Sequence, residues 1–306
     1  MHFALTGATG FLGGHILQKL GKTNNQISAL SRADTSPAPI QTRWIRGRLE
    51  DPQSLRNLVR GTDVVIHCAG TIKEKSRRAF FKTNQEGTAN LLDACKHEDV
   101  QRFIFISSIA ARSPDISSYA ASKASAEELV RASDLNWTIL RPGVIYGPGD
   151  RETLIFFKLA RLGLGLQIGH GRYAMIMAED VANAALTVSE CFETCHKILT
   201  LHDGSRDGYS MGDLFKALEK VLNHRNYILP LPPGLAIGLS SFVNRSLQRF
   251  GKRVPLVTPE KIAEILHPDW TSSDDALNRL TGWSPEYSLH RGLELTAAWY
   301  RSHHWL

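Results

Sequence analysis

The sequence has few cysteines and no long apolar run among its 306 residues. Four cysteines, at Cys68, Cys95, Cys191 and Cys195, are too few for a disulfide scaffold and are typical of a reducing compartment. No apolar stretch reaches the roughly 18 residues of a membrane span, and the first residues lack the basic start of a signal peptide. We therefore expect a cytoplasmic protein.

Acidic residues are absent from one segment. The chain has 36 Lys and Arg against 30 Asp and Glu, and the six basic residues between Lys220 and Pro259 account for the whole excess. The apolar residues 228–243 in this segment are too short and too rich in proline to span a bilayer. The segment can form an ordinary solvated helix face, cover an apolar pocket, or make weak peripheral membrane contact through residues 225–253. Nucleic-acid binding is not expected, because no stacking aromatics alternate with the basic residues.

The order of apolar runs predicts the fold. Over the first 140 or so residues, short apolar runs alternate with helical patterns, which is typical of β-α-β units. The sequence thus predicts an α/β fold, a Rossmann-type doubly wound parallel sheet with a smaller C-terminal substrate lobe. We assign residues 1–150 plus about 174–201 to the Rossmann domain, and about 151–173 and 202–306 to the smaller lobe. The predicted strands are 2–5, 26–30, 43–46, 63–67, 103–107, 137–140 and 198–201, and the predicted helices are 11–20, 52–59, 83–95, 119–131 and 179–188.

Three glycines lie at three-residue intervals between the first strand and the first helix. Gly7, Gly10 and Gly13 allow a tight turn, close approach of a pyrophosphate to the backbone, and a helix N-terminus that faces its negative charge. The turn therefore predicts dinucleotide binding, with contacts that also include its other residues Thr9, Phe11 and Leu12.

The end of the second strand bears on the choice of cofactor. An NAD enzyme is expected to have an acidic residue there, which holds the ribose hydroxyls, but this chain has Ser31 and Arg32. A hydroxyl and a cation suit a ribose 2′-phosphate, so NADP(H) is the preferred cofactor and NAD(H) stays an alternative. Arg32 could instead only cap the strand or stack on adenine.

A tyrosine and a lysine four residues apart form the candidate reactive group. Tyr119 and Lys123 share one face of a predicted helix, where the ammonium is expected to lower the pKa of the phenol. Ser107 and Ser108 come just before, at the carboxyl end of a predicted strand, where open α/β sheets place their ligands.

At this point the sequence resembles the extended short-chain dehydrogenase/reductase superfamily, the NAD-dependent epimerase/dehydratase family. The resemblance covers residues 1–188, and within the family it favours the branch of dihydroflavonol reductases and 3β-hydroxysteroid dehydrogenases. Five motifs in order carry it: TGATGFLG from Thr6, DVVIHCAG from Asp63, NQEGTANLLDAC from Asn84, YAASK from Tyr119 and RPGVIYGPG from Arg141.

The resemblance implies roles for individual residues. Ser108 is expected to hydrogen-bond the reacting oxygen, with Ser107 less favoured, and Tyr119 is expected to be the general acid and base. Lys123 is expected to lower the tyrosine pKa and hold the nicotinamide ribose. Further cofactor contacts are expected from Leu49, Ala69, Gly70, Pro142, Gly143 and Val144.

Two departures from the family pattern bear on ligands. Many relatives have Gly-Asp-Leu where this chain has Gly47-Arg48-Leu49, so adenine contact must rest on other groups. Only 11 positions separate Ser108 from Tyr119, and residues 109–112 lack the Val-Tyr-Gly of sugar-nucleotide enzymes. A sugar nucleotide is therefore disfavoured as substrate.

These observations predict an NADP(H)-dependent oxidoreductase that interconverts a carbonyl and a secondary alcohol on an apolar small molecule. The alternatives are a nucleotide-sugar epimerase or dehydratase with bound NAD, and a non-catalytic NADPH-binding accessory subunit. A homodimer is one arrangement that the sequence leaves open. Cys191, Cys195 and His196 lack a second ligand pair, so no metal site is predicted, and Asp180 is expected to cap its helix.

Overall fold

The computed structural model describes residues 1–33, 42–235, 238 and 258–306. Most of the basic apolar segment, including Arg245, Arg249 and Lys252, lies outside these residues. Within the described part, no helix is long and apolar enough to cross a membrane.

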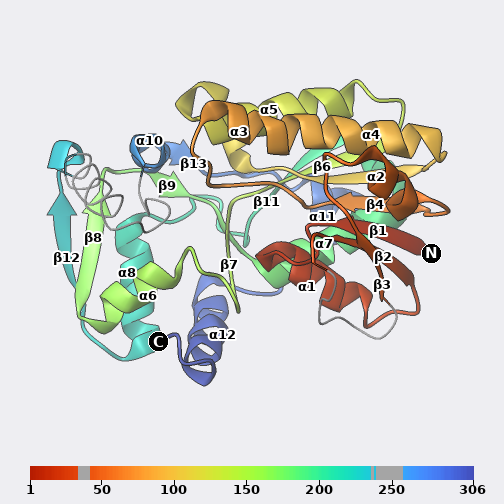
Figure 1. Ribbon diagram of the computed structural model, residues 1–306. Coiled ribbons are helices and arrows are strands. Elements are labelled where there is room, and N and C mark those ends of the chain that lie inside the picture. The colour runs from red at the N-terminus through yellow and green to blue at the C-terminus, as the bar shows by residue number, and fades with distance from the viewer. Residues whose placement is uncertain (34–41, 236–237, 239–257) are drawn as a thin grey trace.

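A seven-stranded parallel sheet forms the larger part of the molecule (Figure 1). Its strand order, β11-β6-β5-β4-β1-β2-β3, reverses at β1, because the chain first extends to β3 and then returns to β4 on the other side. The glycine turn follows β1, so it lies at this switch point, where doubly wound sheets bind ligands. The strands are β1 (His2–Thr6), β2 (Gln26–Ser31), β3 (Thr42–Arg46), β4 (Val64–His67), β5 (Arg102–Ile106), β6 (Asn136–Pro142) and β11 (Lys197–Leu201).

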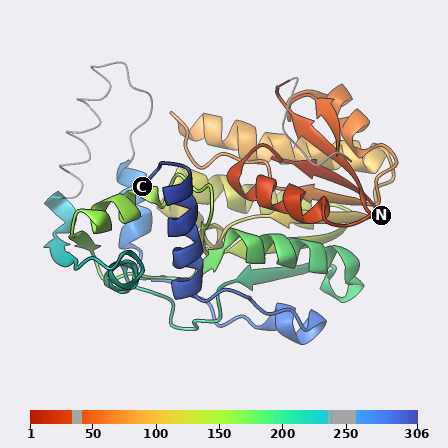
Figure 2. The same cartoon turned by 90° about the horizontal axis from the view of Figure 1, so that it is seen from below.

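Helices cover both faces of this sheet, as Figures 1 and 2 show. One face packs against α1 (Phe11–Leu20) and α7 (Ala178–Glu190), and the other against α2 (Pro52–Val59), α4 (Gly87–His97) and α5 (Ser118–Arg131). Because both faces are covered, β4 and β5 are buried along their whole length, which explains their unbroken apolar runs. The predicted Rossmann-type sheet is confirmed.

One predicted helix differs from the observed structure. The sequence pattern suggests continuous helix over residues 83–95, but the chain forms a short helix α3 (Arg77–Phe81), a π-helical turn (Lys82–Glu86) and then α4. The wider turn directs the Asn84 side chain into the protein interior, where it is buried and hydrogen-bonded. Such local widening is frequent at functional sites.

A second correction concerns Asp180, which does not cap its own helix. The residue before α7, Met177, has no side-chain capping bond. Instead, the Asp180 carboxylate accepts hydrogen bonds from the backbone N–H groups of Glu286 and Tyr287, at 2.9 and 3.2 Å. Asp180 therefore fastens the C-terminal segment to the main sheet.

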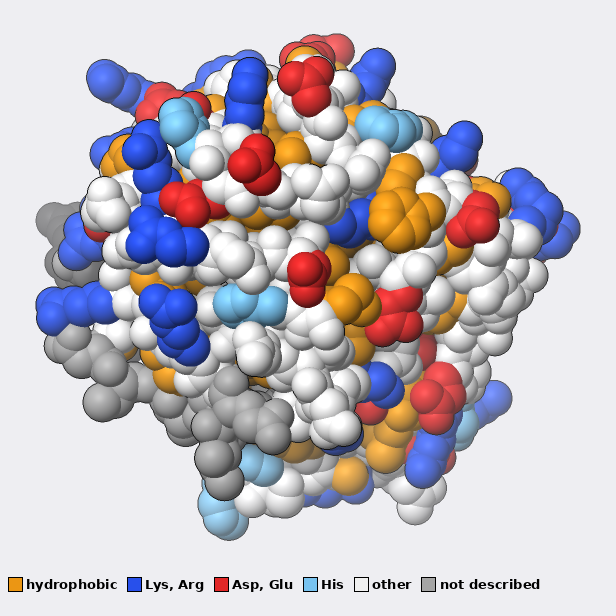
Figure 3. All heavy atoms as spheres, turned by 90° about the vertical axis from the view of Figure 1, so that its right-hand side faces the viewer, with side chains coloured by type: hydrophobic (Ala, Val, Ile, Leu, Met, Phe, Trp, Pro, Cys, Tyr) orange, Lys and Arg blue, Asp and Glu red, His pale blue; other side chains and the backbone are white. Residues whose placement is uncertain are grey.

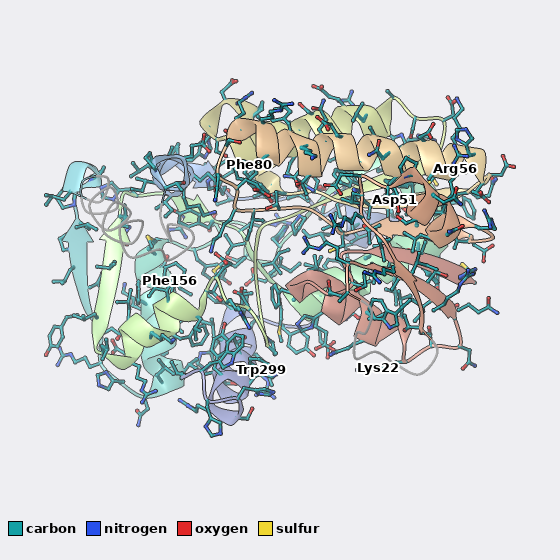
Figure 4. All side chains as sticks on the ribbon, viewed as in Figure 1. Lys22, Asp51, Arg56, Phe80, Phe156 and Trp299 are labelled. Atoms are coloured by element: carbon teal, nitrogen blue, oxygen red, sulfur yellow. The ribbon has the colours of Figure 1, made fainter. Side chains whose placement is uncertain are left out.

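The remaining elements form a smaller lobe beside the carboxyl ends of the strands (Figures 1 and 2). Its core contains Phe157, Phe215 and Tyr300, while Phe156 of α6 and Trp299 of α12 pack at its margin (Figure 4). The helices are α6 (Leu154–Arg161), α8 (Met211–Leu222), α10 (Pro259–Leu266), α11 (Ala276–Thr281) and α12 (Leu289–Ser302), of which α11 packs against the main sheet. Three two-stranded sheets complete the set, β7 (Val144–Tyr146) with β10 (Met175–Met177), β8 (Leu164–Ile168) with β12 (Tyr227–Leu231), and β9 (Arg172–Tyr173) with β13 (Asp269–Trp270).

Candidate active site

The glycine turn between β1 and α1 is built around close backbone contacts. Gly7 has φ +76°, and a Cβ atom there would lie 2.7 Å from the Ala69 nitrogen. At Gly13 a Cβ atom would lie 1.9 Å from the Gly7 carbonyl oxygen. Glycine is therefore required at both positions, because any side chain would push the turn away from α1 or from the residues after β4.

This turn fits a pyrophosphate group. Gly10 precedes α1 without a side-chain cap, and there is no acidic residue in the first turn of the helix. The N-terminus of α1 thus offers backbone N–H groups and the positive end of the helix dipole to an anion. Thr9 and Gly10 are exposed beside it, and Phe11 is half-buried.

The end of β2 carries no acidic side chain. Ser31 is buried and accepts a hydrogen bond from the Ala33 nitrogen at 3.1 Å, whereas Arg32 is exposed. Leu49 packs so closely on α4 that a Cβ atom at Gly87 would lie 2.8 Å from its Cδ1 atom. Leu49 is buried against α4, and its backbone oxygen accepts a hydrogen bond from the Asn90 side-chain nitrogen, at 2.8 Å.

Ser108 and Tyr119 lie together at the carboxyl end of β5. A hydrogen bond with Ser108 lowers the pKa of Tyr119, but burial is the larger effect and raises that pKa to about 12. The negative charge of Glu264 raises it further. The expected lowering of the tyrosine pKa is thus outweighed by desolvation, and the phenol stays protonated.

Ser107 points elsewhere, to a buried carboxylate. Its hydroxyl donates to Glu127, whose carboxylate also accepts from the Arg141 Nε atom at 2.9 Å. Both Ser107 and Glu127 are buried. The structure therefore brings Ser108, and not Ser107, to Tyr119.

Lys123 is held under the same site. Its ammonium donates to the Ile106 carbonyl at 2.8 Å and lies 4.2 Å from the centre of the Phe105 ring. Burial lowers the pKa of Lys123 to about 8, against the opposing effects of the Glu127 and Cys68 groups. Phe80, labelled in Figure 4, closes the other side of Tyr119, with their ring centroids 6.3 Å apart.

A buried hydrogen-bond chain connects the glycine turn to the elements around the site. The Ala69 nitrogen donates to the Thr6 hydroxyl at 3.2 Å, and that hydroxyl lies 2.7 Å from His67 Nδ1. His67 Nε2 lies 3.0 Å from the Thr88 hydroxyl, which donates to the Asn84 carbonyl at 2.6 Å. Because Thr88 gives its proton to Asn84, His67 must donate from Nε2. Burial lowers the pKa of His67 and keeps the ring neutral, so Nδ1 accepts from Thr6 and the tautomer is fixed.

Asn84 continues this chain into the helix of Tyr119. Its side-chain oxygen accepts from the Thr71 nitrogen at 2.8 Å, and its side-chain nitrogen donates to the Ser122 hydroxyl at 2.8 Å. The Ser122 hydroxyl in turn donates to the Tyr119 carbonyl. The resemblance implies that residues 67–70 pass beside the cofactor, but the sequence predicts neither the polar partners of His67 nor a role for Asn84. The available signal was an asparagine, a poor helix former, inside a helical pattern.

The neutral state of His67 has a consequence for stability. Burial lowers the pKa of His67 to about 3 from its ordinary 6.5, with a smaller effect from the Lys123 charge. Between these values the unfolded chain binds a proton that the folded chain does not, so stability falls as pH drops below 6.5. From pH 6.5 to about 5 we expect His67 alone to lower the free energy of unfolding by about 1–2 kcal/mol.

Urea unfolding at both pH values measures this loss. His67→Gln keeps a side-chain donor for Thr88 but cannot titrate, so its unfolding free energy should fall less over the same interval. An equal fall in both proteins would show that His67 is not the group responsible.

The small lobe holds the N-terminus of the helix that carries Tyr119. Glu260 of α10 accepts from the Ser118 hydroxyl at 2.8 Å and from the Ser118 nitrogen at 3.2 Å. Glu264 accepts from the Ser117 hydroxyl at 2.6 Å. Carboxylates are favourable at a helix N-terminus, so these contacts tie the two parts of the molecule together at α5.

The remaining predicted cofactor residues follow the carboxyl ends of β4 and β6. Ala69 and Gly70 follow β4, and a Cβ atom at Gly70 would lie 4.0 Å from Lys123 Nζ. Pro142 ends β6 and is buried, as is Gly143, whereas Val144 is 38% exposed. Cys191 and Cys195 flank a short 3₁₀ turn away from the site, and the described residues contain no cluster that could hold a metal ion.

Comparison with known proteins identifies the family of this chain. A family model described as NAD(P)H-binding matches residues 7–190. The chain is 35% identical to the ceramide reductase of Caulobacter vibrioides, over 99% of this chain and 95% of that one. It is 25% identical to a decarboxylating sterol-4-alpha-carboxylate 3-dehydrogenase of Dictyostelium discoideum, over 95% of this chain and 98% of that one.

Solved structures share the whole fold. The UDP-glucose 4-epimerase of Thermotoga maritima superimposes with a TM-score of 0.77 at 20% identity, covering 99% of each chain. Together with the matched family and the 35% identical reductase, the glycine turn and the arrangement of Ser108, Tyr119 and Lys123 lead to one assignment. The chain belongs to the extended short-chain dehydrogenase/reductase superfamily, the NAD-dependent epimerase/dehydratase family, and is an NAD(P)-dependent oxidoreductase.

Proposed function

We propose that this enzyme uses NADPH to reduce a ketone on a lipid-like substrate to a secondary alcohol, with Ser108, Tyr119 and Lys123 as its catalytic residues. The observation that carries the proposal is the grouping of these three side chains at the carboxyl end of β5. The raised pKa of Tyr119 supports the reductive direction, because a protonated phenol is ready to donate.

The three residues then divide the chemistry. NADPH, when bound, supplies the hydride that forms the new C–H bond at the carbonyl carbon. Tyr119 donates the phenol proton to the carbonyl oxygen, so ketone, hydride and proton together give the alcohol. Ser108 donates a second hydrogen bond to the same oxygen and stabilises the negative charge that develops there.

Lys123 stabilises the Tyr119 phenolate, and it would hold the nicotinamide ribose of the cofactor. Its ammonium lies in a buried site, so the electrostatic stabilisation of a phenolate is stronger there than in water. When Tyr119 loses its proton, this charge limits the cost of the phenolate, and solvent then returns a proton to the phenol. The Ile106 carbonyl fixes the ammonium in this place.

A ceramide-type lipid is the substrate class we propose. Support comes from the 35% identity with a ceramide reductase along nearly the whole chain. Ceramide carries a secondary alcohol at C3 beside an amide, so the matching ketone is 3-oxoceramide. The short connection from Ser108 to Tyr119 supports an apolar substrate over a nucleotide sugar, since it lacks the residues expected to hold the sugar.

A direct assay separates reduction from epimerisation. Purified enzyme should consume NADPH in a one-to-one ratio with a short-chain 3-oxoceramide and form the 3-hydroxy product, identified by mass spectrometry. UDP-glucose should give neither NADPH loss nor UDP-galactose. Epimerisation of the sugar without net cofactor consumption would refute the proposal and establish the nucleotide-sugar alternative.

The choice of NADP(H) over NAD(H) rests on Arg32 and can be tested there. Because Arg32 is exposed at the end of β2, its guanidinium can pair with a ribose 2′-phosphate. Arg32→Asp removes this attraction and adds repulsion. We therefore expect the binding free energy to shift in favour of NADH over NADPH by about 2–4 kcal/mol. Binding titrations with both nucleotides measure the ratio, and an unchanged value would place Arg32 outside the cofactor site.

A further inference from the structure

Exposed cations gather around α6. This helix lies in the small lobe, at the end of the molecule far from β3 (Figure 1). Lys158 and Arg161 lie one turn apart on this helix, Arg151 precedes it, and Arg301 lies in the last turn of α12; all four are exposed. None of them forms an ion pair with a carboxylate in the part of the chain that the structure describes.

Two hollows lie beside these cations, and their walls contain no aspartate or glutamate. One, of about 250 Å³, is lined by Arg161, Leu222, His224, Arg301 and Leu306. The other, of about 380 Å³, is lined by Arg151, Leu154, Lys158, His304 and Trp305. Both hollows therefore offer positive charge at a solvent-exposed surface, which suits the phosphate of an anionic headgroup.

Apolar side chains are exposed next to the same cations. Leu162, which follows Arg161, is 72% exposed, and Tyr227 is 64% exposed. The two segments are adjacent, because the Tyr227 nitrogen donates to the Gly163 carbonyl at 2.9 Å and Tyr227 pairs with Leu164 in the sheet of β8 and β12. Leu229, two residues further along β12, is also exposed.

An aromatic residue completes the surface. The Arg151 guanidinium lies 5.1 Å from the Trp305 ring, which packs on Trp299 with its centroid 4.9 Å away. Tryptophan beside arginine and lysine is typical of side chains at the level of lipid headgroups. Figure 3 shows the opposite end of the molecule, where Lys and Arg are interspersed with Asp and Glu.

We propose that this region, the α6 surface, docks the enzyme on a bilayer that contains anionic phospholipids. We define it by Arg151, Lys158, Arg161, Arg301, Leu162 and Tyr227. Its cations attract the headgroups, and its exposed apolar side chains enter the boundary between headgroups and acyl chains. A nucleic-acid duplex would use the charges but would gain nothing from burying Leu162, so the exposed aliphatic component favours a membrane.

This proposal goes beyond the proposed reduction, because binding to vesicles is measured without ketone or cofactor. It also differs from the sequence-based expectation of membrane contact through residues 225–253, because its four cations lie on or beside α6 and α12, outside that segment. Tyr227 of β12 belongs to both regions, so both can contribute. The expectation for residues 225–253 stays a prediction.

Co-sedimentation with phosphatidylglycerol–phosphatidylcholine vesicles tests the proposal. We expect the wild-type protein to bind at low salt, to bind less as salt is added, and to ignore pure phosphatidylcholine. In the triple variant Lys158→Glu/Arg161→Glu/Arg301→Glu, the partition coefficient should fall roughly tenfold or more. The matched control, Lys22→Glu/Arg43→Glu/Lys96→Glu, reverses three exposed charges of the other lobe and should bind nearly as the wild type does.

Two further measurements make the outcome decisive. Unchanged melting temperature and unchanged turnover on a water-soluble ketone show that the α6 variant is folded. Leu162→Ser/Tyr227→Ser should weaken vesicle binding even though it changes no charge. The proposal is overturned if the α6 variant binds vesicles as tightly as the control variant does. It is also overturned if Leu162→Ser/Tyr227→Ser binds vesicles like the wild type and duplex DNA displaces the wild-type protein from them as well as free anionic vesicles do. Failure of the ketone assay alone would leave the vesicle result standing.

Discussion

Replacing Tyr119 with phenylalanine is expected to lower turnover by ~10²–10⁴-fold while leaving NADPH affinity nearly unchanged. The phenylalanine keeps the ring that packs against Phe80 but has no proton to donate to the carbonyl oxygen. Steady-state rates with a saturating ketone, combined with a fluorescence titration of NADPH, separate the two effects.

The chain provides a matched control for this variant. Tyr227 is exposed on β12, so Tyr227→Phe removes a hydroxyl without touching the site and should keep wild-type turnover. Near-normal turnover in Tyr119→Phe would rule out the proton-donor role and with it the proposed mechanism. A loss of NADPH binding as large as the loss of turnover would assign Tyr119 to the cofactor site instead.

Gly13→Ala is expected to have the second large effect, on cofactor binding. The new Cβ atom would lie 1.9 Å from the Gly7 carbonyl oxygen and 2.5 Å from the Gly7 carbonyl carbon. Neither backbone atom can rotate out of the way, so the glycine turn must shift away from α1. We expect a cost of about 3 kcal/mol or more, equal to a loss of roughly 100-fold in NADPH affinity.

The neighbouring Gly14→Ala is the control. A Cβ atom there meets only the Ala8 oxygen, at 3.9 Å, which is ordinary contact. This variant should bind NADPH normally and be slightly more stable, because alanine is a better helix former than glycine. Equal NADPH affinity in both variants would contradict the close-packed turn, and calorimetry of the two proteins decides it.

Much of the fold could be predicted because local patterns and global topology agree. Residues 64–66 of β4 and 103–106 of β5 are continuous apolar runs, since both faces of these strands are covered. The helix predicted over 52–59 is α2, and the Asp51 side chain before it accepts a hydrogen bond from the Gln53 nitrogen. The glycine spacing located the phosphate turn, because steric contacts such as that of Gly13 allow no other residue.

The residues that sequence reasoning missed depend on long-range contacts. His67 is one imidazole in an apolar strand, and its partners Thr6 and Thr88 are 61 and 21 positions away. Glu264 lies in the small lobe, and no local pattern connects it with Ser117 at the start of α5. The direction of the Tyr119 pKa was wrong for a related reason, since spacing reveals the lysine but not the extent of burial.

Isotope transfer tests the proposed hydride transfer to a ketone. The wild-type enzyme is incubated with a 3-oxoceramide and NADPH deuterated at nicotinamide C4, separately on each face. We expect one of the two labelled cofactors to place a single deuterium on C3 of the alcohol, in equal amount to the NADP⁺ formed. Product without deuterium from either cofactor, or full recovery of NADPH and ketone, would contradict it.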